Sequence, residues 1–484
     1  MFPGEGRLSS KRMKISTLWV ALVLVAGCAT FHPQPLSPSQ TAAAFEARTL
    51  ESPGLRAFLE TTLHRAITPW PVEAWDITLL TLAALYYHPD LDVARAQWAV
   101  AEAEVITAGG RPNPNVGFTP AYNANAASGV SPWILGLTVD IPLETAGKRR
   151  YRMRRATQLA EASRLHIAAV SWQVRSRLRT SLLDLDAARR AEPIVHRQQG
   201  LQEDIVKGLE QRFAVGEASQ FEVTQAHIAR DQTRFALREV QKRRAEARVR
   251  VADALGVPVG ALDGVTLSWD FLEQLPPATA LPAQDIRRQA LLNRTDILAA
   301  LGEYAASQSA LQLELAKQYP DIHLGPGYAW DQGDQKWSLG FSISLPVVNR
   351  NEGPIAEAKA RRTEAAARFT HLQARVIGES ERALAGTLAA LHTLETADAL
   401  LLARDKQLQS VQARLRVGEA DRLALLSAQL ELAAGQVARL NALVEAQTSL
   451  GLLEDALQRP LDASSPLPSV PEAHLRDAQG HTHP

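Results

Sequence analysis

The chain has 484 residues, of which 46% are hydrophobic, and its 52 Lys and Arg residues are matched by 52 Asp and Glu residues. This length allows a large core or an elongated repeat architecture, and the hydrophobic content, mostly Ala, Leu and Val, is typical of long packed helices. Because a net charge of zero provides no field that would hold a polyanion, we expect no nucleic-acid partner.

The N-terminus has the pattern of a bacterial export signal. Lys11, Arg12 and Lys14 precede an apolar run over residues 15–26, which is too short to span a bilayer comfortably. We therefore predict a cleaved signal peptide over residues 1–27.

The end of this run resembles a bacterial lipobox, the motif whose cysteine is lipidated and becomes the mature N-terminus. It has the sequence Val-Ala-Gly-Cys28, and Ala29 follows where an Asp would resemble an inner-membrane retention signal. We predict that Cys28 anchors a lipidated segment over residues 28–72 to the outer membrane through several acyl chains, since one chain alone binds only marginally. The alternative is a chance thiol behind an ordinary signal peptide. Cys28 is the only cysteine, so no intramolecular disulfide can form.

Two halves of the chain share one pattern. The sequence Arg-Phe-Ala-Val-Gly-Glu-Ala-Ser over residues 212–219 returns as Arg-Leu-Arg-Val-Gly-Glu-Ala-Asp over residues 414–421, a shift of 202 positions. Chance similarity between helical stretches rich in Ala and Leu would not explain why landmarks outside the helices also recur. At a shift of 204 positions, Trp133, Gly136 and Pro142 match Trp337, Gly340 and Pro346. The predicted boundaries are residues 73–257 for the first repeat, 258–284 for an equatorial excursion, 285–460 for the second repeat and 461–484 for a flexible C-terminal tail.

Each repeat holds two stretches in which apolar and small polar residues alternate, within residues 115–142 and 321–346. From Trp337 to Leu345, for example, every second residue is apolar and the others are Ser or Gly. These stretches have the length of tilted membrane-crossing strands. A soluble sheet with one buried face is the competing interpretation. Four strands cannot enclose a barrel, and lipid does not tolerate open edges, so we expect a trimer that supplies twelve strands.

Two stretches are predicted to be single long helices, over residues 148–213 and 355–415, of roughly 90–100 Å each. Leu residues recur every seven positions from Leu394 to Leu415, which predicts coiled-coil packing. Pro193 should kink the first of these helices. The basic run over residues 148–155 is interpreted as a solvated face. Shorter helices are predicted over residues 75–87, 91–108, 222–255, 285–318 and 422–457, and a short strand over residues 265–269.

The junctions over residues 141–149 (Ile-Pro-Leu-Glu-Thr-Ala-Gly-Lys-Arg) and 345–353 (Leu-Pro-Val-Val-Asn-Arg-Asn-Glu-Gly) carry a family resemblance. With the repeat, they make the chain similar to TolC-family outer-membrane factors over nearly its whole mature length. It most resembles members that serve heavy-metal resistance pumps of the cobalt–zinc–cadmium type. The resemblance implies a mainly helical fold with membrane strands, in which a trimeric twelve-stranded β-barrel continues into a helical periplasmic tunnel.

The resemblance also implies partners and a place in the cell. A homotrimer in outer-membrane lipid would work with a membrane-fusion adaptor protein and an inner-membrane resistance-nodulation-division pump. The chain would then be a passive exit duct, opened by those partners, for heavy-metal cations. The alternatives are a duct for organic compounds or for type I protein secretion, and a soluble periplasmic coiled-coil scaffold.

Both repeats turn at a Val-Gly pair followed by a residue that suits a helix N-cap. Helix-ending geometry alone would explain these residue types. The resemblance adds a role for these tips in docking the adaptor, through the following residues: Arg212, Val215, Gly216, Glu217, Ser219, Arg414, Val417, Gly418, Glu419 and Asp421. Some family members narrow the closed end with aspartate rings just beyond the tips. The corresponding candidate gate residues are Glu222, Gln225, Ala424 and Ser427, which do not reproduce an aspartate ring.

The sequence lacks the motifs of catalysis. It has no phosphate-binding glycine loop, nucleophile elbow, paired-cysteine motif or helical zinc-binding pattern, so we expect no enzymatic activity, no cofactor and no metal site. His474, His481 and His483 gather in the Pro-rich tail, where a disordered solvated end is the favoured interpretation.

Overall fold

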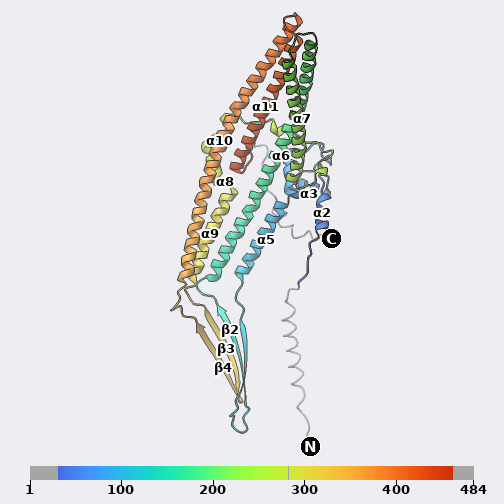
Figure 1. Cartoon of the computed structure of the whole chain (residues 1–484). Coiled ribbons are helices and arrows are strands. Elements are labelled where there is room, and N and C mark those ends of the chain that lie inside the picture. Colours follow the sequence, from blue (N-terminus) through green and yellow to red (C-terminus); the bar gives the residue numbers. More distant parts are fainter. Residues whose placement is uncertain (1–30, 282, 462–484) are drawn as a thin grey trace. The chain divides into compact units, whose positions relative to one another are not determined.

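The computed structural model describes residues 31–281 and 283–461, so the predicted signal peptide, Cys28 and the C-terminal tail beyond residue 461 lie outside the described part of the chain. The described residues divide into two units, within residues 31–48 and 49–461. Helix α2 (Pro38–Glu46) belongs to the first unit. The second unit holds all the elements that follow (Figure 1).

Two very long helices run through the second unit. α6 (Lys148–Ala214) has 67 residues and α10 (Glu352–Arg416) has 65, so each is roughly 100 Å long. α6 continues through Pro193. Each long helix turns back at its tip into a helix of 36 residues, α7 (Gln220–Leu255) or α11 (Arg422–Leu457), which packs against it. In the described part of the chain, no helix combines the length and the apolar character that a bilayer crossing requires.

The remaining helices form pairs on the way to the strands. The first pair is α4 (Ile77–Tyr87) with α5 (Pro89–Gly109), and the second is α8 (Ala283–Asn293) with α9 (Thr295–Ala316). The prediction of one helix over residues 285–318 was therefore wrong. The extended backbone of Arg294 separates α8 from α9. A new helix can begin after Arg294 because its first N–H group has a side-chain acceptor: Gln458 accepts from Thr295 N at 2.9 Å. The break corresponds to the Pro89 break of the first copy.

The excursion between α7 and α8 contains three 3₁₀ turns, η1 (Val259–Leu262), η2 (Asp270–Leu272) and η3 (Ala278–Ala280). The predicted strand over residues 265–269 reduces to a single bridge between Leu267 and Trp75. Pairing stops there because Asp76, the next residue after Trp75, is the N-cap of α4 and its chain turns into that helix.

Four strands form one antiparallel sheet in the order β1-β2-β3-β4. Their bounds are Asn115–Tyr122, Trp133–Leu143, Ile322–Asp331 and Asp334–Ile343. The central pairing joins the two copies, since β2 of the first pairs with β3 of the second. β4 begins at Asp334 rather than at Trp337, because Gly333, at φ +118°, allows a tight turn after β3. Within the described residues, the outer edges of β1 and β4 have no strand partner.

The register gives the sheet two different faces. Directly paired residues share a face, so Phe118, Leu137, Tyr328 and Trp337 form one apolar row. This face is exposed, and Trp337 is 80% accessible. The other face carries mostly Gly, Ser, Thr and Ala. The alternation predicted from the sequence is therefore confirmed, and the apolar face has no cover within the described chain.

Part of the basic run at the start of α6 ties the strands to the helices, whereas Arg150, Arg154 and Arg155 are exposed, as the interpretation of a solvated face expects. Lys148 is buried and donates to the Asp321 carboxylate and to the Tyr319 carbonyl, both at 2.7 Å. Arg149 and Arg152 donate to carbonyls at the C-terminal end of α5, which attract cations. Three basic side chains therefore fix the junction where β2 enters α6.

The largest core lies where α3 (Pro53–Leu63), α4, α6 and the end of α7 meet the excursion. Leu55, Leu80, Leu178 and Leu255 are fully buried there. A smaller core joins α8, α10 and α11 around Val376 and Leu453. Since β2 leads into one end of α6 and the first tip follows its other end, this packing leaves the sheet and the tips at opposite ends (Figure 1).

Candidate functional site

The two tips have the same backbone geometry. Gly216 and Gly418 lie in the left-handed region at φ +82° and +80°. The next residues close the helix ends, because Glu217 N donates to Arg212 O and Glu419 N donates to Arg414 O, each at 2.8 Å. This arrangement ends a helix without a penalty only when glycine occupies the left-handed position. The geometry of the helix ends is thus sufficient to explain why both copies have glycine after valine at the tip.

The helix that follows each tip is capped by a side chain. Ser219 and Glu222 form a capping box, and Asp421 accepts from Ala424 N at 2.7 Å. Hydrogen bonds from the Ser219 backbone and hydroxyl lower the pKa of Glu222. The pKa of Asp421 is lowered first by the Ala424 N–H and then by Arg212. Both carboxylates are therefore ionised at neutral pH and already hold the helix starts.

An ion pair joins the two tips within one chain. The Arg212 guanidinium donates to Asp421 Oδ2 at 2.6 Å, although the two residues are 209 positions apart. Arg414, the counterpart of Arg212 in the second copy, donates to the Glu419 carbonyl at 3.4 Å. The repeat in the sequence identifies these residues as tip residues, but no local pattern predicts that Arg212 and Asp421 pair.

The outermost tip residues are open to solvent. Val215 and Val417 are each 71% exposed, and no heavy atom lies within 4 Å of a Cβ built on Gly216 or Gly418. A shallow hollow of about 490 Å³ lies beside the second tip. Its lining residues are Val411, Arg414, Gly418, Glu419, Ala420, Asp421 and Ala424.

The candidate gate residues all lie exposed on the first turns of the helices after the tips. Glu222 and Gln225 are on α7, and Ala424 and Ser427 are on α11. Glu222 is the only acid among the four, and its carboxylate is occupied by the capping box. In the described residues, no group of three or more His, Cys, Asp or Glu side chains could hold a metal ion.

A buried polar network holds α11 against α6, and no motif in the sequence indicates it. Arg175 donates to Glu454 Oε2 at 3.0 Å, and Arg179 lies 3.6 Å from the same oxygen. A Cβ at Gly451 would overlap the Arg179 guanidinium, so glycine leaves the space that this side chain fills. Burial lowers the pKa of Arg179, and burial raises the pKa of Asp455.

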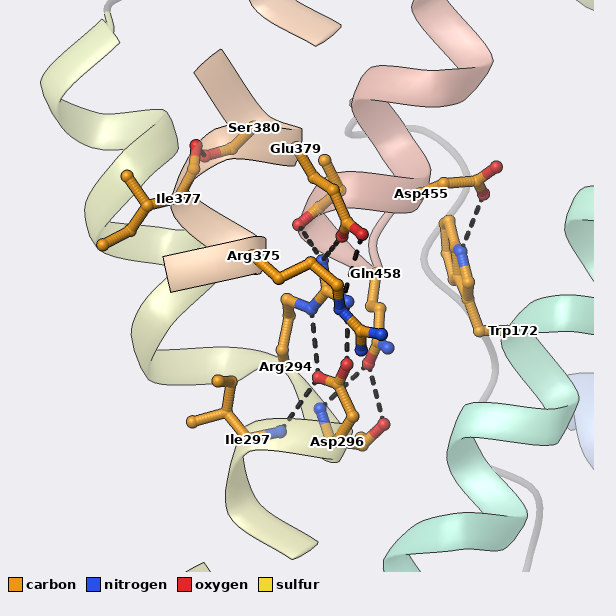
Figure 2. A network of polar contacts seen from close by, with 12 residues as sticks. Trp172, Arg294, Asp296, Ile297, Arg375, Ile377, Glu379, Ser380, Asp455 and Gln458 are labelled. Atoms are coloured by element: carbon orange, nitrogen blue, oxygen red, sulfur yellow. Dashed lines mark hydrogen bonds and ion pairs between the residues drawn. The ribbon is translucent and has the colours of Figure 1, made fainter. Parts of the chain in front are cut away.

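A second network joins α9, α10 and α11 (Figure 2). Arg294 points toward Asp296 on one side, with its Nη2 2.7 Å from Asp296 Oδ2, and toward Glu379 on the other, at 3.3 Å. The same guanidinium donates to the Ala456 carbonyl at 3.1 Å. Figure 2 also shows Trp172 of α6 donating to Asp455, which links this region to the first network. Helix α11 is therefore fixed by buried ions near its C-terminal end, far along the chain from its tip.

Comparison with known proteins identifies the family. The family model described as outer membrane efflux protein matches residues 81–257 and 286–457. The chain belongs to this family. It is accordingly an efflux channel of the outer membrane, similar to TolC, and not an enzyme.

Relatives of the efflux channel have names that refer to different substances. The pyoverdine export outer membrane protein OpmQ of Pseudomonas aeruginosa is 25% identical over 407 residues, covering 78% of this chain and 84% of that protein. The cobalt-zinc-cadmium resistance protein CzcC of Cupriavidus metallidurans is 23% identical over 230 residues, covering 46% and 52%.

Solved structures of outer-membrane channels share the mainly helical fold with strands that the sequence predicted for the efflux channel. The outer membrane protein VceC of Vibrio cholerae has a TM-score of 0.63 at 20% identity, covering 80% of this chain and 97% of that chain. The outer membrane channel CmeC of Campylobacter jejuni has a TM-score of 0.65 at 16% identity, covering 93% and 98%.

Proposed function

We propose that this efflux channel is a homotrimeric, passive exit duct of a tripartite pump, with its tips docked on an adaptor protein. The sheet is the observation that carries the proposal. Its apolar face is exposed, which suits contact with lipid. Among the described residues the outer edges of β1 and β4 have no partner strand, and lipid does not tolerate such open edges. Three sheets joined edge to edge would close a twelve-stranded barrel with the apolar faces outward and the polar faces around the lumen.

The helices give independent support for a trimer. Helix α7 carries a row of exposed apolar residues at intervals of seven: Phe221, Ile228 and Phe235. The corresponding residues of the second copy, at a shift of 202 positions, are Leu423, Leu430 and Val437, and all three are half-buried. Leu423 lies against α6, since a Cβ on Gly208 would be 3.1 Å from its Cδ2. By the repeat, the α7 row would contact α10 of a neighbouring protomer.

Replacing Phe235 by Glu is expected to reduce trimer formation, because an unpaired carboxylate would be buried in each of three interfaces. Loss of a central aromatic costs an interface about 2 kcal/mol or more. The measurement is the oligomeric state of the purified protein in detergent by light scattering. Ala236→Glu, at the adjacent exposed position on the same helix, is the control. Wild-type trimer content in Phe235→Glu would contradict this packing.

The partners proposed are a membrane-fusion adaptor and an inner-membrane resistance-nodulation-division pump. The exposed Val-Gly pairs of both tips offer the adaptor an apolar surface with open space above each glycine. The Arg212 and Asp421 pair would hold the tips of one protomer together, with Glu222, Gln225, Ala424 and Ser427 facing the gate. Opening would then be driven by the partners rather than by chemistry in the duct.

The proposed cargo is a heavy-metal cation, and a specific alternative is an organic compound. The similarity to CzcC favours the first, while the similarity to OpmQ, whose name specifies a pyoverdine, favours the second. A deletion strain is expected to become several-fold more sensitive to cobalt, zinc and cadmium salts, and the measurement is growth over a concentration series with and without the gene restored. Sensitivity confined to organic compounds would select the alternative, and loss of a secreted protein would indicate type I secretion.

Lipidation of Cys28 is proposed from the sequence alone. Labelling with a radioactive fatty acid should mark the wild-type protein, and Cys28→Ala should lose the label completely. Equal labelling of the two proteins would exclude this anchor.

A further inference from the structure

The polar face of the sheet carries two acid–base pairs amid small uncharged side chains, one at each end of the strands. Between Asn115 and Ser342 it consists mostly of Gly, Ser, Thr and Ala, and the ion pair of Asp331 and Lys336 lies beside the β3–β4 turn. Asp140 of β2 and His323 of β3 are at the opposite end of the strands, beside the helices. Of the two pairs, only this one contains an imidazole, and it lies away from the β3–β4 turn that the Asp331–Lys336 pair flanks.

The two side chains are in direct contact. His323 Nδ1 lies 3.0 Å from Asp140 Oδ1 and 3.1 Å from Oδ2. The side chains are 37% and 43% exposed, so the pair is accessible from the polar side of the sheet. The neighbouring Asp321 carboxylate is already bound by Lys148 at 2.7 Å. Asp140 is therefore the carboxylate that orients this imidazole.

This arrangement orients the Nε2 atom of His323 so that it can bind a metal ion. When Nδ1–H donates to a carboxylate, the tautomer is fixed and Nε2 keeps its lone pair. Metal-binding histidines are almost always oriented by such a bond, to a carboxylate, a backbone carbonyl or water. Imidazole nitrogen suits zinc, cobalt, nickel and copper, whereas magnesium and calcium prefer oxygen ligands. The chemistry thus discriminates between classes of divalent cation.

We propose that His323 Nε2, oriented by Asp140, is a transient binding site for a transition-metal dication in the lumen of the barrel. The inference rests on the proposed trimeric channel, in which three such sites would surround the lumen, and it deepens the proposed cargo. Water completes the coordination of each ion. One protein ligand per ion gives weak binding, and weak binding suits a conduit, because an ion that enters must also leave.

The test is the conductance of the full-length wild-type protein in planar lipid bilayers, with zinc chloride or magnesium chloride added. Zinc is expected to reduce the current at concentrations where magnesium has no effect. His323→Ala and His323→Gln should each abolish the zinc effect, and Asp140→Asn should raise the half-blocking concentration about 10-fold or more, as is usual for loss of a carboxylate that orients a metal ligand.

His392→Ala is the matched control, because His392 forms a similar pair with Glu395, at 3.3 Å, on α10 outside the sheet. This variant should keep the zinc effect unchanged. A conducting wild-type channel that zinc does not affect, or a zinc effect that persists in both His323 variants, would overturn the site and leave the channel standing. A wild-type protein that forms no channel would overturn the proposed function, and the site with it.

Discussion

Glutamate at both Gly216 and Gly418 is expected to abolish efflux while leaving the protein in the outer membrane. Each glycine has a positive φ, so a side chain adds strain of roughly 1–2 kcal/mol. The chain itself has space for it, since no atom lies within 4 Å of either Cβ. A docked adaptor would bury the two new glutamate charges. If this costs about 3 kcal/mol of the docking free energy, the affinity of the channel for the adaptor falls more than 100-fold. Resistance should fall to that of the deletion strain.

The control for the tip variant is Gly200→Glu on α6. Gly200 also has open space around its Cβ, but it lies in the helix away from the tip. The measurements are resistance in cells, the amount of protein in outer-membrane fractions, and capture of the adaptor by chemical cross-linking. Full resistance in the double variant with normal outer-membrane levels would disprove docking at the tips.

The sequence predicted best the elements whose pattern extends over many consecutive residues and needs no distant partner. The long helices agree with α6 and α10 to within a few residues, because uninterrupted helix-forming sequence needs no tertiary information. The alternation of the strands also determined the two faces, since the period of two is a property of the strand itself. The pairing of β2 with β3 across the copies is not contained in either alternation, and only the structure reveals it.

The predictions that failed depended on distant partners. The helix break at Arg294 is stabilised by the bond from Thr295 N to Gln458, which is 163 positions from Thr295, so the helix-forming sequence around the break does not predict it. The basic run at residues 148–155 looked solvated because charges usually are, yet Lys148 is buried against Asp321. At the candidate site, the repeat identified the tips, whereas the Arg212–Asp421 contact could not be deduced from it.

The buried pair of Arg175 with Glu454 makes Glu454→Gln the variant with the largest expected loss of stability. Both side chains are less than 10% exposed, and removing one charge leaves the guanidinium groups of Arg175 and Arg179 without their anion. Breaking a buried pair in this way costs about 3–5 kcal/mol. The measurement is the thermal unfolding of the purified protein in detergent. Glu445→Gln, at an exposed position of the same helix, should leave the unfolding temperature unchanged.

The neighbouring Asp455→Asn should behave in the opposite way. Burial raises the pKa of Asp455, with Ser176 and Trp172 offsetting part of the rise, so the folded state retains this proton above the pH at which the unfolded chain loses it. Stability therefore falls as pH increases from the ordinary carboxyl pKa to the raised one, and the full penalty persists above it. Asn never ionises, and it can still accept from Trp172. The unfolding temperature of Asp455→Asn should match or exceed that of the wild type at pH 7.5, and the difference should be smaller at pH 4. A fall in unfolding temperature as large as that of Glu454→Gln would show instead that the Asp455 charge itself stabilises the network.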